Sequence, residues 1–264
     1  MKRKRLTLFV LGILPLLYGP STAVAQLSSF AVLGGSTVTN TSTPTIVNGN
    51  LGVSPGSAVT GFPPGIVVGG SIHAADAVAA QAQTDLTTLY NNLANASCNA
   101  DLTGQDLGGL TLTPGVYCFA SSAQLTGTLT LDAQGDSNAL FIFRIGSTLT
   151  TASASSVLLI NSASSCGVLW QLGSSATLGT GTALAGNIVA LTSITLNTGA
   201  SVTGRVLARN GAVTLDNSHV TVCSGGPALP LSVGAIPTLS GWAMVVLTGL
   251  LVLFGFAALR RRAT

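Results

Sequence analysis

The chain has 264 residues, enough for one large domain plus processing segments, and only 6% of them are charged. The formal charge of +3 arises at the two ends, because residues 26–236 contain three Arg against seven Asp and therefore carry −4. This mildly acidic region has no basic patch, which excludes nucleic acid as a partner.

The first 25 residues are predicted to be a secretory signal peptide. Residues 2–5 are basic, residues 6–17 are mostly apolar, and Ala23-Val24-Ala25 is a small-x-small cleavage motif. A retained membrane anchor is the alternative, but the apolar run is short for a bilayer span. We therefore expect Gln26 to be the first residue of the exported protein.

Short strands separated by turns are expected over residues 27–70. Residues 27–38 predict a strand pair broken at Gly34-Gly35, and residues 54–56 and 62–65 are Gly- and Pro-containing turn signals. This region is expected to supply the first coils, or an end cap, of the solenoid that the later repeats predict.

Residues 72–95 predict an amphipathic helix, since they lack Gly and Pro and place apolar residues three or four positions apart. Ser71 is the expected N-cap, and Asp76 lies near the first turn, where a negative charge is favourable. A helix of ~34 Å would match seven coils spaced ~4.8 Å apart. We expect it to cover one flank of the core with Ala75, Val78, Ala79, Ala82, Leu86, Leu89, Tyr90 and Leu93.

Four cysteines in an exported chain indicate two disulfides, for which three pairings are possible. We favour Cys98–Cys118, which would fasten the helix end to the next coil, and Cys166–Cys223, which would pin the last coil. A zinc site is the alternative, but no CxxC motif or His pair supports it. No metal and no small-molecule cofactor is therefore predicted.

Six Thr-Leu pairs recur at offsets of 19, 18, 29, 18 and 19 residues. Side chains alternate in a strand, so each pair turns Leu inward and Thr outward. A strand every ~18–20 residues suits one coil of a β-solenoid, with an inner Leu column and an outer Thr column. Residues 157–160, inside the longest gap, predict an extra strand. The pairs are Thr111-Leu112, Thr130-Leu131, Thr148-Leu149, Thr177-Leu178, Thr195-Leu196 and Thr214-Leu215.

The C-terminal segment, residues 233–264, is predicted to be a sorting tail. Residues 239–259 are uncharged and apolar, about 32 Å as a helix, and a cluster of three Arg follows them. The plain interpretation is a membrane anchor with its Arg cluster in the cytoplasm. The segment also resembles IPTL-CTERM sorting tails, which implies cleavage by a membrane sorting protease or transpeptidase near Ile236-Pro237-Thr238-Leu239.

Motifs spread over residues 27–223 are jointly specific for one fold. They comprise residues 51–56, 61–65, 72–77, 112–117, 129–136 and 141–149. Together they resemble the ice-binding-protein-like family of secreted microbial proteins. The resemblance implies a discontinuous, right-handed, three-sided β-solenoid (β-helix) with one long α-helix packed alongside, here over residues 26–232. It also implies adsorption to ice through a flat solenoid face, although no residue carries over as a known site.

The outward Thr column is our own candidate for contact with ice or an ordered-water surface. Regularly spaced methyls and hydroxyls can hold ordered waters, although Thr is also simply a favourable outward strand residue. Thr148, Thr177, Thr195 and Thr214 are expected to form one column. The full candidate set is Thr130, Thr148, Thr150, Thr177, Thr195, Asn197 and Thr214.

A cell-surface adhesin or matrix protein without ice activity is the alternative function, and catalysis is not expected. The region after the signal peptide has no Glu, no Lys and two His, whereas polysaccharide-cleaving enzymes need paired carboxylates. Asp132 and Asp136 fit a Gly-rich turn. His73 is expected to be structural, hydrogen-bonded near Gly69-Gly70, and His219 lies on a terminal strand without a nearby nucleophile.

Overall fold

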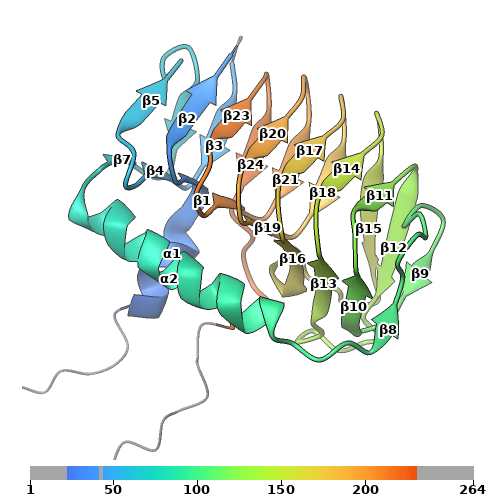
Figure 1. Cartoon of the computed structure of the whole chain (residues 1–264). Helices are drawn as coiled ribbons and strands as arrows, with labels where there is room; N and C mark the ends of the chain where they lie inside the picture. Colours follow the sequence, from blue (N-terminus) through green and yellow to red (C-terminus); the bar gives the residue numbers. More distant parts are fainter. Residues whose placement is uncertain (1–22, 42–43, 231–264) are drawn as a thin grey trace, which may run out of the picture.

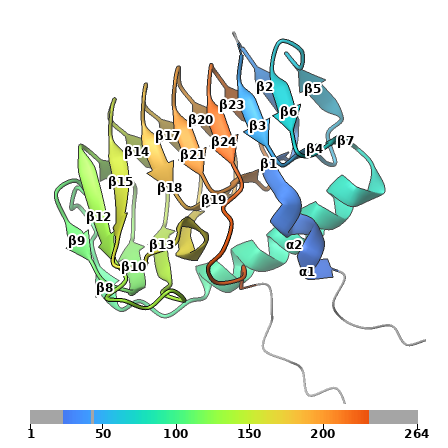
Figure 2. The same ribbon diagram turned by 180° about the vertical axis from the view of Figure 1, so that it is seen from behind.

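Three parallel β-sheets form the sides of a solenoid, with one long helix beside it (Figure 1). The computed structural model describes residues 23–41 and 44–230. Successive coils contribute strands to the three sheets in turn, and Figure 2 shows the coils stacked from the opposite side. The predicted three-sided β-solenoid with a flanking helix is confirmed.

Sheet A lies beneath the helices and is buried on both faces over much of its length. Strands such as Val168–Leu172 are buried at every position, which explains their continuous apolar sequence. In order along the solenoid, sheet A contains β7 (Ile72–Ala74), β4 (Asn50–Val53), β1 (Phe30–Gly34), β22 (Val206–Ala208), β19 (Asn187–Ala190), β16 (Val168–Leu172), β13 (Phe141–Ile145), β10 (Gly115–Phe119) and β8 (Ala100–Asp101).

Sheet B alternates buried and accessible residues along its strands, as expected of a sheet with one solvated face. Its strands, in order, are β5 (Ala58–Thr60), β2 (Thr37–Asn40), β23 (Val213–Leu215), β20 (Ile194–Leu196), β17 (Ala176–Leu178), β14 (Leu149–Thr151) and β11 (Ala123–Leu125).

Sheet C closes the third side, and its order follows the same axis. It contains β6 (Ile66–Val68), β3 (Ile46–Asn48), β24 (His219–Thr221), β21 (Ser201–Thr203), β18 (Ala183–Ala185), β15 (Ser156–Ile160), β12 (Thr128–Asp132) and β9 (Thr111–Leu112). The strand predicted at residues 157–160 is β15, a regular member of this sheet rather than an addition to it.

The solenoid is discontinuous in sequence, because the first coils pair with the last one. Val32 pairs with Val206 in sheet A, Thr39 with Thr214 in sheet B, and Val47 with Val220 in sheet C. The chain therefore builds one end first, crosses to the other end through the helix, and winds back until it meets its own beginning (Figure 1).

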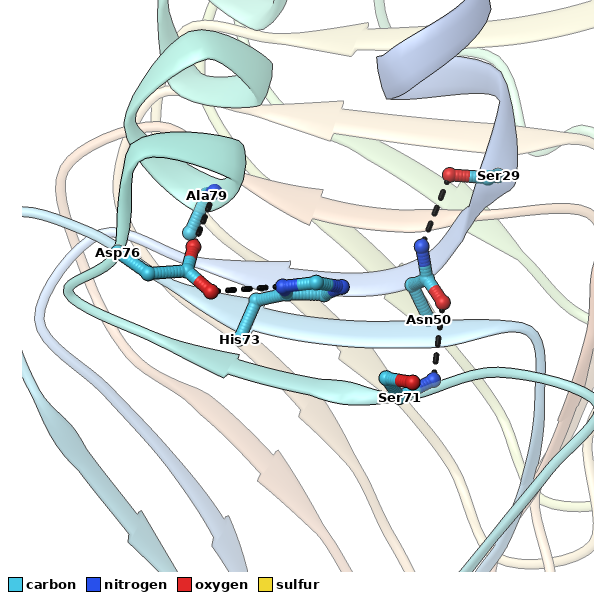
Figure 3. A network of polar contacts seen from close by, with 6 residues as sticks. All are labelled: Ser29, Asn50, Ser71, His73, Asp76 and Ala79. Carbon is cyan, nitrogen blue, oxygen red and sulfur yellow. Dashed lines mark hydrogen bonds and ion pairs between the residues drawn. The ribbon is translucent and has the colours of Figure 1, made fainter.

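The long helix α2 (Ala77–Ala94) is shorter at its start than predicted. Residues 72–74 pair with β4 as strand β7, so the expected helix start and the Ser71 N-cap are wrong. Asp76 is the N-cap and accepts a hydrogen bond from the Ala79 amide at 2.8 Å (Figure 3). The 18 residues still give a helix of about 27 Å lying across sheet A.

Two apolar clusters stabilise the fold. One fills the solenoid interior, where Phe143 stacks on Trp170 at 4.0 Å between ring centroids and on Tyr117 at 5.6 Å. The other lies between sheet A and the helices, where Leu27 from α1 (Ala23–Ser29) packs with Leu86 and Leu89 of α2. The helix therefore covers one flank, as predicted, although Ala75 lies before it in a left-handed conformation (φ 53°) and is exposed.

Both favoured disulfides are present, Cys98–Cys118 after α2 and Cys166–Cys223 at the last coil. Cys166 belongs to a short 3-10 helix, Ser165–Gly167, which leads into β16. Within the described residues no helix is both long and apolar enough to cross a membrane. The predicted membrane helix at residues 239–259 and most of the signal peptide lie outside that part of the chain.

Candidate functional site

The outer face of sheet B carries one column of aligned polar residues, the site we call the threonine column. Thr177 pairs with Thr150 on one side and Thr195 on the other, and Thr195 pairs with Thr214. The first coils extend it through Thr39 and Thr60. In order, the threonine column is Gln124, Thr150, Thr177, Thr195, Thr214, Thr39 and Thr60.

Thr148 belongs to a neighbouring column, which corrects the prediction that it aligns with Thr177. Leu149 pairs with Ala176 rather than Leu178, so Thr150 occupies the central position. A shift of two residues keeps a side chain on the same face of the sheet, but moves it to the next outward-facing position along the strand. Thr148 lies beside the column, with its hydroxyl 2.8 Å from that of Ser122.

Two of the six Thr-Leu pairs lie on a different side of the solenoid. Thr130 pairs with Thr111 in sheet C, so the single outer Thr column predicted from all six pairs is wrong. The 18-residue offset between Thr130 and Thr148 contains a change of sheet rather than one complete coil. Asn197 lies just beyond β20, half-buried, and its backbone N–H donates to the Leu178 carbonyl at 3.0 Å. It therefore marks the edge of the face.

A buried apolar layer keeps the threonine column level. The residues on either side of Thr177, Thr195 and Thr214 are apolar and point inward, as with Ile194 and Leu196 around Thr195, which are both fully buried. Parallel strands set neighbouring column members about 4.8 Å apart. No column member is charged, and the Thr60 hydroxyl donates to the Thr39 hydroxyl at 3.1 Å.

A ladder of buried hydroxyls lines the corner where sheet B turns into sheet C. Thr182 lies 2.8 Å from the Thr151 hydroxyl, and Ser155 donates to the Leu125 carbonyl at 2.9 Å. The backbone N–H of Ser218 donates to the Thr45 hydroxyl at 3.1 Å. These bonds satisfy backbone groups where the chain bends, and they fix the strand ends of sheet B relative to each other.

The other two outer faces are less suited to a flat contact. Helix α2 covers sheet A, packing against β1, β13, β16 and β19. Sheet C exposes bulky apolar side chains, and Leu158 of β15 retains 51% of its accessible surface. Among the described residues, sheet B is therefore the uncovered and regular side.

His73, Asp132 and Asp136, which were considered for catalysis, have structural roles. His73 lies 2.7 Å from Asp76, not at the Gly69-Gly70 turn as expected (Figure 3). The bond from the Ala79 amide, aided by His73, lowers the pKa of Asp76. Asp132 and Asp136 each accept a backbone amide two residues ahead, as in a turn. Within residues 23–41 and 44–230, no three His, Cys or Asp side chains gather as a metal site would require.

Sequence reasoning missed Thr39, Thr60 and Gln124 as column members. Thr39 and Thr60 each follow a Val, but Asn40 and Gly61 stand where the repeated pattern has Leu. The Val-Thr dipeptide at each position is the sequence feature that could have identified these two threonines. Their place beside Thr214 depends on the closure between the first and last coils, which no local pattern encodes.

Comparison with known proteins gives matches to both the domain and the tail. A family model described as Ice-binding-like matches residues 32–221, and one described as IPTL-CTERM motif matches residues 235–262. A protein named Ice-binding protein from Nostoc sp. (strain HG1) is 61% identical over 195 residues, 74% of this chain and 71% of that protein.

Solved structures agree with this match. The crystal structure of an ice binding protein from an Antarctic biological consortium is 43% identical, with a TM-score of 0.73, and the match covers 82% of this chain and 97% of that one. The ice-binding protein from the Antarctic ascomycete Antarctomyces psychrotrophicus is 39% identical with a TM-score of 0.73, over 76% and 98% of the two chains.

Proposed function

Because this chain belongs to the ice-binding-like family, we propose that it is an exported protein that binds ice through the threonine column of sheet B. The observation that carries this proposal is the unbroken line of Thr150, Thr177, Thr195, Thr214, Thr39 and Thr60 along one uncovered face. The protein acts by binding rather than by catalysis.

The chemistry of the column favours ordered water. Each Thr places a methyl and a hydroxyl outward at the strand spacing of about 4.8 Å. A hydroxyl that anchors a bridging water loses little free energy by immobilising it. An uncharged face also avoids the strongly hydrated groups that would hold water in a non-crystalline arrangement. Waters along the column can therefore merge with an ice lattice.

The six column threonines and Gln124 are the proposed contacts. Thr148 contributes from the neighbouring column, and Asn197 from the edge of the face. Thr130 lies on sheet C and is dropped from the proposed site.

Substitutions on one coil test the proposal. Thr195→Tyr raises a bulky ring from the column, and Thr203→Tyr places the same ring on exposed sheet C of the same coil. The free energy of unfolding of both variants should lie within about 0.5 kcal/mol of the wild-type value. Ice recrystallisation inhibition should fall sharply only for Thr195→Tyr. Equal activity of the two folded variants would contradict the choice of face.

Surface display accompanies this function, as the match of residues 235–262 to the IPTL-CTERM motif supports. The signal peptide directs export, and a membrane sorting protease then removes the tail. Mass spectrometry of the native surface protein should lack the peptide that ends in Arg262. Recovery of intact residues 239–264 from mature protein would refute processing.

A surface adhesin without ice activity is the second candidate, favoured by the same sorting motif. Thermal hysteresis and recrystallisation inhibition of the wild type separate the two. A folded wild type that lacks both activities would leave adhesion as the function.

A further inference from the structure

Asp85 is a buried carboxylate that the proposed function does not use. It is 8% exposed, in the middle of α2, and its Oδ1 accepts a hydrogen bond from Gln81 at 2.9 Å. Its Oδ2 is buried and has no hydrogen-bond partner within the described residues. A buried charge without a partner is strongly unfavourable, so this group calls for a counter-ion.

Helix α1 covers the flank of α2 on which Asp85 lies. Val78 and Asn92, seven residues to either side, share that flank, and Asn92 donates to the Pro230 carbonyl at 3.0 Å. Gln83 lies on the opposite flank, where it donates to the Gly34 carbonyl at the end of β1. Because α1 leads into the beginning of β1, it lies on the Asp85 side, and Figures 1 and 2 both show it crossing α2.

The contact between the two helices is close and apolar around this carboxylate. Leu27 of α1 is fully buried in one cluster with Ala82, Leu86 and Leu89, the residues that surround Asp85 on α2. Gln26 precedes Leu27 directly and is half-buried. The residue expected to begin the exported protein therefore lies next to the contact between α1 and α2, on the flank of α2 that carries Asp85.

We propose that removal of the signal peptide creates the counter-ion of Asp85, namely the new α-amino group of Gln26. This inference rests on the export step of the proposed function, not on ice binding. Hydrolysis breaks the peptide bond between Ala25 and Gln26. The hydroxyl of water stays on the Ala25 carbonyl carbon as a carboxyl group, and its proton goes to the Gln26 nitrogen. That amine takes up a second proton from solvent and becomes an ammonium group.

The two arginines near this contact have other partners, so neither serves as the counter-ion of Asp85. Arg205 donates to the Ser28 carbonyl and to Asn187, and Arg209 lies over the Tyr90 ring at 5.4 Å. Neither forms an ion pair with Asp85. Burial raises the pKa of Asp85, and the Gln81 bond opposes that effect. An α-amino group has a pKa of roughly 7.7–8.0 and is positive at neutral pH.

The pairing makes the mature protein differ from its precursor at one point. While the signal peptide is attached, Gln26 carries a neutral amide and Asp85 keeps its unpaired oxygen. After cleavage the ammonium completes the contact between α1 and α2, next to the coils where the chain meets its own beginning. Only the cleaved chain can therefore complete this contact when it folds.

The chain allows a clean test, because residues 26–264 contain no lysine. Mild acetylation of the mature protein therefore modifies its α-amino group alone among amines. Four proteins are compared: free and acetylated, each with Asp85 or with Asp85→Asn. All carry Gln26→Ser, which prevents cyclisation of an N-terminal glutamine.

The α-amino pKa, measured by NMR, should be raised by about one unit or more in the Asp85 protein. It should return to its ordinary value in Asp85→Asn. Acetylation should lower the urea midpoint only when Asp85 is present. An ordinary α-amino pKa in both proteins, or equal losses on acetylation, would overturn the inference.

Two further measurements separate this inference from the rest of the proposal. Mass spectrometry of the exported native protein should find an N-terminal peptide that begins at uncyclised Gln26. Another N-terminus, or a cyclised Gln26 without its ammonium, would overturn the pairing while leaving ice binding untouched. Recrystallisation inhibition, measured on the same four proteins, should be equal, because the threonine column lies on another side of the solenoid.

Discussion

Arg205 donates hydrogen bonds from Nε and Nη2 to the carbonyl oxygen of Ser28, at 3.1 and 2.7 Å, across 177 residues of sequence. The same side chain reaches the Asn187 amide oxygen through Nη1 at 2.9 Å. One buried guanidinium thus ties the start of the chain to two late coils. Burial lowers its pKa to about 10, so it stays charged at neutral pH.

Replacing Arg205 should therefore weaken the junction between the first and last coils. Arg205→Ala leaves the Ser28 carbonyl and the Asn187 amide without their charged donor, and should destabilise the protein by about 3 kcal/mol. Arg209→Ala is the matched control, since its half-exposed guanidinium contacts only the Tyr90 ring among the described aromatic residues, and should cost about 0.5–1 kcal/mol. Urea unfolding measures both. Equal losses would mean that Arg205 does not hold the junction.

The helix is expected to act as a cover for sheet A. Leu86→Asp places an unpaired charge in the apolar cluster beneath α2 and should destabilise the fold by several kcal/mol, roughly 3–5. Thr84→Asp puts the same group on the exposed side of the helix, two residues away, and should change stability by less than about 0.5 kcal/mol. Thermal melts of the pair give the comparison. An unchanged melting temperature for Leu86→Asp would refute the packing.

Register decides which threonines matter for ice. Thr150→Tyr interrupts the threonine column and should strongly reduce recrystallisation inhibition, whereas Thr130→Tyr alters sheet C and should leave activity near the wild-type level. Both variants should stay folded, since the substituted side chains point away from the core. Loss of activity in Thr130→Tyr with retention in Thr150→Tyr would move the site to sheet C.

Acid should remove the stabilising effect of the helix cap. The pKa of Asp76 is lowered in the folded protein from its ordinary value of 3.8, mainly by the Ala79 amide. A carboxylate with a depressed folded pKa stabilises the fold fully above its unfolded pKa and loses that effect as pH falls through the lower folded value. Asp76→Ala should therefore cost about 1 kcal/mol at neutral pH.

The difference between Asp76→Ala and the wild type should shrink below pH 3.8, as the wild-type carboxyl takes up its proton. The measurement is the free energy of unfolding of both proteins from pH 7 down to pH 2.5. A constant difference over that range would show that the carboxylate does not cap α2. Partial exposure of Asp76 limits the size of the effect.

The local sequence pattern was sufficient to predict the architecture, but not to predict which residues align between neighbouring strands. Alternation within each Thr-Leu pair correctly predicted Leu196 inward and Thr195 outward. It could not predict that Thr148 lies two residues from the column: Leu149 pairs with Ala176, so the coil is two residues shorter than the spacing from Thr148 to Thr177. Nor could it predict that Thr130 lies on another sheet, since equal spacing in sequence can join positions on different sides of a coil.

The start of the helix illustrates a second kind of limit. Residues 72–74 have a sequence compatible with the helix pattern, but β4 offers an open edge, and Ile72 pairs with Leu51 there. Tertiary pairing overrides local propensity at that point. The capping residue then moves from Ser71 to Asp76, which was predicted only to favour the first turn.

The closure between the first and last coils has a consequence for folding kinetics. Strands β1, β2 and β3 can pair with β22, β23 and β24 only after those late strands have been synthesised. The first strands of the domain therefore cannot complete their pairing until nearly the whole chain is available. Such distant pairing makes folding slow, because loop closure must precede most of the favourable contacts. A chain interrupted before residue 206 would leave exposed strand edges on both halves, an aggregation hazard. Export as a complete, still unfolded polypeptide would avoid that hazard.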